Sequence, residues 1–96
     1  MIIVNAKLPV KKEKNDEVIK QAEALINASR THEGNISYNL YRDVLDDSLV
    51  FVEKWESSEA LDAHMKTPEF VEFSENIEDF LTGEMEIAII AGDEIN

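Results

Sequence analysis

Two scarce side chains that could carry chemistry lie in one short segment, the tryptophan Trp55 and the histidine His64. Trp55 is the only tryptophan and His64 is one of two histidines. An imidazole titrates near neutral pH, which makes His64 a candidate general base or acid. An indole N–H at the end of a strand could donate a hydrogen bond into a cavity, although most single tryptophans serve packing. An inert, hydrogen-bonded histidine at a helix end stays an open alternative for His64.

Asn5 is a third candidate, because it interrupts an otherwise apolar strand. A buried amide is costly unless it is hydrogen-bonded, so Asn5 either lies at a ladder edge or lines a pocket. Both interpretations stay open. Tyr38 and Tyr41 should point to opposite faces of one strand, so at most one of them lines the same cavity. Three further charged or titratable side chains are interpreted as solvated surface groups: His32, Arg42 and Lys54.

The elements that must position these side chains follow from the hydrophobic periods. A short apolar run before Pro9 predicts a strand over 2–8, and alternating residues predict one over 36–41. Two further strands are expected over 49–56 and 85–91. A helical period predicts one helix from about residue 15, with Gly34 as its stop signal, and a second from Ser57 or Ser58 that restarts at Thr67-Pro68 and closes at Gly83. The order β-α-β-β-α-β predicts an α+β, ferredoxin-like domain over 1–96, with a four-stranded antiparallel sheet and both helices on one face.

Helix-capping residues refine this prediction. Asn15 or Asp16 should cap the first helix, and Ser57 or Ser58 the second. Thr67 before Pro68 should cap the restarted helix. Within the second helix, Leu61 is the expected core residue, and His64, three positions later, should share its inward face.

Composition narrows the functional classes. A net charge of −12 repels phosphate backbones and anionic lipid, so neither nucleic acid nor a membrane is an expected partner. The absence of cysteine excludes disulfides, thiol catalysis and thiolate metal sites. The acidic segment 43–47 lacks the ligand spacing and the glycine of a calcium loop, so no metal site is expected. No targeting segment is evident, which makes the cytoplasm the expected location.

Both faces of the predicted sheet carry apolar residues. Val50 and Val52 lie on one face of the third strand and Phe51 on the other, and Ile89 and Ile90 divide the last strand in the same way. Two helices can cover only one face, and monomers avoid large exposed apolar patches. The sequence therefore predicts a homodimer that packs two sheets face to face.

Two segments, THEGNISYNLYRD and FVEKWESSEALDAHMKTPEF, resemble the antibiotic biosynthesis monooxygenase (ABM) family, which includes the quinol monooxygenases. The most specific part runs from Glu53-x-Trp55-x-Ser57 through Ala60-Leu61-x-x-His64 to Pro68-x-Phe70. The resemblance implies a dimeric α+β barrel with a pocket between sheet and helices. It also implies oxidation of a quinol or polycyclic phenol by molecular oxygen without metal, flavin or haem. His64 would then be the base or proton relay, and Asn5 and Trp55 would donate hydrogen bonds to the oxyanion.

Two alternatives remain beside this resemblance. The haem-degrading branch of the superfamily also carries an asparagine on its first strand, matched by Asn5. It has a tryptophan where His64 stands and its axial histidine near Ser74, and neither matches. A non-enzymatic small-molecule binder or stress-related dimer would show the same core pattern. The pattern does not specify the substrate.

Overall fold

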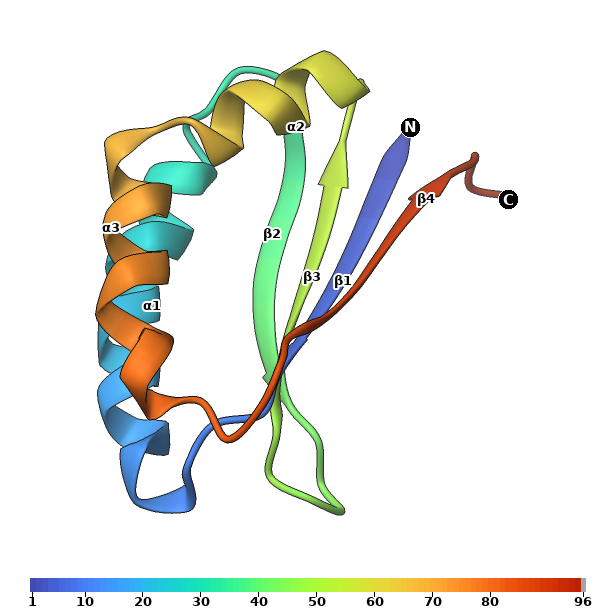
Figure 1. Ribbon diagram of the computed structural model, residues 1–96. Coiled ribbons are helices and arrows are strands. Elements are labelled where there is room, and N and C mark those ends of the chain that lie inside the picture. Colours follow the sequence, from blue (N-terminus) through green and yellow to red (C-terminus); the bar gives the residue numbers. More distant parts are fainter. Residues whose placement is uncertain (96) are drawn as a thin grey trace.

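In the computed structural model, which describes residues 1–95, helices cover one face of an antiparallel sheet (Figure 1). The elements are β1 (Ile2–Leu8), α1 (Asn15–Ser29), β2 (Asn35–Arg42), β3 (Leu49–Trp55), α2 (Ser58–Met65), α3 (Pro68–Ile77) and β4 (Glu86–Ala91). The sheet has the order β2-β3-β1-β4, and every neighbouring pair is antiparallel. The predicted ferredoxin-like α+β fold is therefore confirmed. None of the described helices is long and apolar enough to cross a membrane.

The sheet register decides which side chains face the helices. Val4 on β1 pairs with Glu53 on β3, and Glu53 pairs with Tyr38 on β2. Directly opposed residues in a sheet point to the same face. Val4, Glu53 and Tyr38 are all buried. The register thus carries one carboxyl group into the helix-covered face, beside apolar and aromatic neighbours.

The first helix begins and ends differently from the sequence prediction. Asn15 is already helical, and its amide donates to the backbone oxygen of Asp47 (3.2 Å), so it does not cap the helix. The helix ends at Ser29, before the predicted stop at Gly34. Gly34 has a φ of 81°, and an added Cβ would lie 2.5 Å from the Cβ of Ala60. Gly34 lets the turn before β2 approach α2 closely, in a left-handed backbone conformation.

The caps of α2 and α3 agree with the prediction. The Ser57 hydroxyl accepts a hydrogen bond from the Ala60 N–H, and the Thr67 hydroxyl accepts one from the Phe70 N–H. Pro68 occupies the first turn of α3, where its missing N–H is tolerated. These two caps fix the break between the helices. They leave the end of α2, with His64, directed at the sheet.

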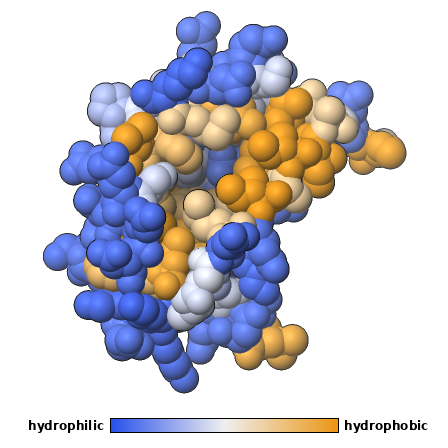
Figure 2. All heavy atoms as spheres, in the orientation of Figure 1, coloured by the Kyte–Doolittle hydropathy of each residue, from blue (hydrophilic) through white to orange (hydrophobic). Residues whose placement is uncertain are grey.

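The strand β4 lies at an edge that the helices do not cover. Ile87 and Ile89, on its helix-facing side, are 55% and 56% exposed, and Ile90, on the other side, is 47% exposed. Figure 2 shows the apolar atoms of this edge as a continuous patch beside a hollow. The sheet therefore ends in an apolar strand that one chain does not bury.

Candidate active site

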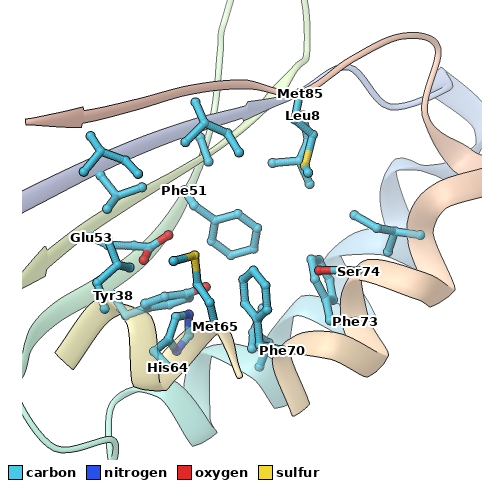
Figure 3. Close-up of a pocket in the computed structure, with 17 residues that line it drawn as sticks. Leu8, Tyr38, Phe51, Glu53, His64, Met65, Phe70, Phe73, Ser74 and Met85 are labelled. Carbon is cyan, nitrogen blue, oxygen red and sulfur yellow. The ribbon is translucent and has the colours of Figure 1, made fainter. Parts of the chain in front are cut away.

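An apolar cavity of about 70 Å³ lies between the sheet and the helices α2 and α3 (Figure 3). Seventeen residues line it, and most are aliphatic or aromatic. The polar side chains in the lining are Tyr38, Glu53, His64 and Ser74. Within residues 1–95, no three His, Cys, Asp or Glu side chains are grouped as a metal site requires. The cavity thus combines an apolar wall with a few polar groups, which is typical of small-molecule sites.

A surface depression of about 800 Å³ adjoins the cavity between α3 and β4. Ser74, Ile77, Met85 and Ile87 line both spaces. Figure 2 shows a hollow between the helices and β4. Ligand sites usually measure roughly 300–1,000 Å³. The cavity, at about 70 Å³, is smaller, so an aromatic ligand must displace side chains as it enters. Met65 and Met85, both flexible, stand in the lining and can yield.

Glu53 places a carboxyl group in this cavity from the middle of β3. The indole N–H of Trp55 donates to its Oε1 at 3.0 Å. Burial raises the pKa of Glu53 to about 7, although the hydrogen bond from Trp55 acts in the opposite direction. A group with a pKa near the working pH can both accept and return a proton. Glu53 is therefore suited to general acid–base catalysis.

In the sequence, Glu53 stands out only as part of the family motif. The signal that could have identified it is the alternation of β3, because Phe51, Glu53 and Trp55 fall on one face. Since Phe51 and Trp55 are plainly core residues, the carboxylate between them must also point inward. All three are buried in the structure.

His64 projects from α2 into an aromatic cluster. Its ring centroid lies 4.6 Å from that of Trp55, 5.2 Å from Tyr38 and 5.1 Å from Phe70. Its Nε2 is buried and has no hydrogen-bond partner among the described residues. Burial, together with the nearby His32, lowers the pKa of His64 to about 4, although Glu69 raises it. His64 is consequently neutral at pH 7.

A chain of hydrogen bonds links His64 to the surface. Its Nδ1 lies 3.0 Å from the Nδ1 of His32, and the Nε2 of His32 lies 2.6 Å from Oε1 of Glu69. The hydrogen bond from His32 lowers the pKa of Glu69, which favours the carboxylate as acceptor. In one of the two possible tautomer assignments, the Nε2–H of His32 donates to Glu69 and its Nδ1 accepts from the Nδ1–H of His64. That arrangement leaves a lone pair on the Nε2 of His64.

The interpretation of His32 as a solvated surface group is wrong. Its side chain is 15% exposed and is held between His64 and Glu69. The error arose because His32 follows α1 in a polar turn. Its two partners lie on α2 and α3, far along the chain, and no local pattern reveals them.

Asn5 does not line this cavity, so of its two open interpretations the one that places it in this pocket is wrong. It is exposed on the sheet face away from the helices and pairs with Val52 and Ala88. The physical reason is strand alternation, because Val4 and Ala6 occupy the inward positions of β1. The Asn5 amide therefore cannot donate to a ligand held beside His64.

Trp55 does lie beside His64, but its N–H is directed to Glu53 and not into open space. Of the two tyrosines, Tyr38 is buried and lines the cavity, whereas Tyr41 is exposed on the outer face. Burial and the nearby Glu53 charge raise the pKa of Tyr38, which keeps its hydroxyl protonated. The structure thus brings together His64, Trp55 and Tyr38, and adds Glu53.

Comparison with known proteins places the chain in a family. Residues 1–76, which include Tyr38, Glu53, Trp55 and His64, match the family model described as antibiotic biosynthesis monooxygenase. YcnE of Bacillus subtilis, which carries a provisional monooxygenase name, is 32% identical over 88 residues, covering 91% of this chain and 93% of its own length. The protein sll1783 of Synechocystis sp. is 40% identical over 89 residues, or 92% of this chain, and the match spans 60% of the longer relative.

Solved structures agree with this match. A conserved protein from Methanosarcina mazei is 31% identical and superposes with a TM-score of 0.91, covering 96% of this chain and 92% of that one. Sequence and fold therefore point the same way over nearly the whole chain. This chain belongs to the antibiotic biosynthesis monooxygenase family.

Proposed function

We propose that this protein is a cofactor-independent monooxygenase that oxidises a quinol or a polycyclic phenol with molecular oxygen. The observation that carries the proposal is the apolar, aromatic-walled cavity that buries the titratable side chains of Glu53 and His64. Family membership supports the oxygenase class, and the aromatic walls support a flat aromatic substrate.

For this reaction the protein has to supply only proton transfer and a site that encloses the substrate. Ground-state oxygen is a triplet and reacts slowly with closed-shell molecules, but an electron-rich phenolate can donate one electron to it. A 1,4-naphthoquinol and O₂ would give a hydroxynaphthoquinone and one water. His64 is proposed as a catalytic residue whose Nε2 accepts a hydrogen bond or a proton from a substrate hydroxyl. Trp55 would act through Glu53 as a positioning residue.

Oxygen consumption tests this function directly. We expect the chelator-treated protein to accelerate oxygen uptake above autoxidation with at least one member of a panel of reduced naphthoquinols and anthrones. Autoxidation releases hydrogen peroxide, whereas monooxygenation releases water, so added catalase should return oxygen only in the protein-free control. Mass spectrometry should find one atom from ¹⁸O₂ in the product.

No uptake with any panel member would overturn the oxygenase proposal. Retention of the same compounds under anaerobic conditions, without consumption in air, would then favour the small-molecule binding alternative. Loss of activity on chelation, with recovery on adding a metal, would contradict the cofactor-independent mechanism while keeping the oxygenase.

We also propose that the chain forms a homodimer through the sheet. The exposed apolar residues of β4, with the half-buried Val50 and Val52 on the outer face, support this arrangement. Sedimentation equilibrium at micromolar concentration should give twice the 10.9-kDa chain mass. Ile90→Glu should shift the protein toward the single-chain mass, and Glu84→Gln, at an exposed loop position, should not. A wild-type mass of one chain would contradict the proposal.

The cytoplasmic location stays a prediction.

A further inference from the structure

The carboxyl group of Glu53 is the least explained feature of the cavity. It is 5% exposed, yet no Lys, Arg or His of residues 1–95 forms an ion pair with it. Its only hydrogen bond among these residues is the one from the Trp55 indole to Oε1. Burying a carboxyl group with one hydrogen bond and no ion pair lowers the stability of the fold. Such a cost is commonly associated with a functional role.

The geometry directs this carboxyl group at the place where a ligand would lie. Figure 3 shows it projecting from the sheet into the cavity, toward the space that Phe51 and Met65 also border. Trp55 holds Oε1, and Oε2 has no hydrogen-bond partner among the described residues. One oxygen is therefore fixed by the protein, and the other is available to a ligand.

We propose that Glu53 is a further catalytic residue, which takes the proton from a hydroxyl of the aromatic substrate, and that Trp55 is the positioning residue that holds its carboxylate. This inference rests on the proposed monooxygenase function. It gives His64 and Glu53 separate tasks, since a quinol has two hydroxyl groups and each acid–base residue can engage one.

The proton and electron balance closes without another reactant. Glu53 accepts the hydroxyl proton, and the resulting anion passes one electron to O₂. The substrate radical and superoxide then combine, which forms a carbon–oxygen bond and a peroxide anion. Glu53 returns its proton to the outer peroxide oxygen. The O–O bond breaks as the same carbon loses its hydrogen, which leaves a carbonyl group and one water, and Glu53 is again a carboxylate.

The charge environment supports this division of tasks. The pKa of Glu53 is about 7 and that of His64 about 4, so the carboxylate holds a transferred proton more strongly than the imidazole does. The groups that face Glu53 are Trp55 on its own strand, Tyr38 on β2 and His64 on α2. Its partner on β1, Val4, carries no charge. No cation therefore competes with the substrate for the carboxylate.

Glu53→Gln is the first test, because glutamine keeps the size and can still accept the Trp55 hydrogen bond but cannot exchange a proton. We expect oxygen uptake to fall by about a hundredfold or more. The wild-type pH profile of kcat/KM should rise with an inflection near 7, and the variant should lose that inflection. In Trp55→Phe the inflection should move to higher pH, because the hydrogen bond that favours the carboxylate is gone. Glu56→Gln, at an exposed position just after the same strand, is the matched control and should change neither.

A nitrophenol separates this inference from the oxygenase proposal, since its anion is coloured and it needs no oxygen. In difference spectra against the free nitrophenol at the same pH, wild type should increase the ionised fraction on binding, and Glu53→Gln should bind the nitrophenol without that increase. Turnover that persists in Glu53→Gln with the inflection intact would overturn the role of Glu53 alone. Ionisation of the nitrophenol without oxygen uptake by any quinol would overturn the oxygenase and leave that role standing. Neither binding nor uptake by wild type would overturn both.

Discussion

Replacing His64 by alanine is expected to slow oxygen uptake by about a hundredfold or more, the usual contribution of a general acid or base. The imidazole is neutral near pH 7 because burial lowers its pKa to about 4. Its Nε2 has no partner among the described residues, so a substrate hydroxyl would be its first. Oxygen-electrode rates with the best quinol, corrected for autoxidation, measure the effect. His64→Gln should restore the packing without restoring the rate.

The linked residues provide a graded control for His64. His32→Gln and Glu69→Gln act through the hydrogen-bond chain, not on the substrate, so each should cost less than His64→Ala. Added imidazole should rescue His64→Ala in part, because the small base can enter the space that the truncation leaves. Equal rates for wild type and His64→Ala would show that His64 is a packing residue and that the proton chemistry lies elsewhere.

The fold was predictable because its signals are local. The apolar run Ile2–Leu8, the helical period after Asn15 and the two caps at Ser57 and Thr67 each specify one element without reference to the rest of the chain. Their order then leaves few topologies. The predictions that failed were boundaries, such as the end of α1 before Gly34. There, a close contact with Ala60 and not helix termination explains the glycine.

The site was less predictable because it depends on contacts between distant segments. His64 could be placed facing inward from its spacing to Leu61, and both are buried. The contacts of His32 with His64 and Glu69 join the turn after α1 to α2 and α3, and they have no signature in sequence. Asn5 shows that a local pattern can also suggest a wrong site. A polar residue in an apolar strand suggests a pocket, but the alternation of β1 places it on the other face.

Truncating Trp55 to alanine should lower the free energy of unfolding by about 3–5 kcal/mol, a large share of the roughly 5–15 kcal/mol that stabilises a domain. The ring is 0% exposed and packs against His64 and, edge-on, against Tyr38.

Trp55→Phe should lower the free energy of unfolding by less than Trp55→Ala, and the loss should depend on pH. The raised pKa of Glu53, about 7, means that stability from this group is complete below its ordinary value near 4.5 and is lost as the pH rises through 7. Without the indole N–H, the pKa of Glu53 rises further. At pH 8 the variant then buries an ionised carboxylate without that hydrogen bond, whereas at pH 5 the carboxyl group is neutral. Urea denaturation followed by circular dichroism should therefore show a larger loss for Trp55→Phe at pH 8 than at pH 5. Equal losses at both pH values would mean that the indole serves packing alone. Combining Trp55→Phe with Glu53→Gln should remove the difference, since no carboxylate then remains to be left unpaired.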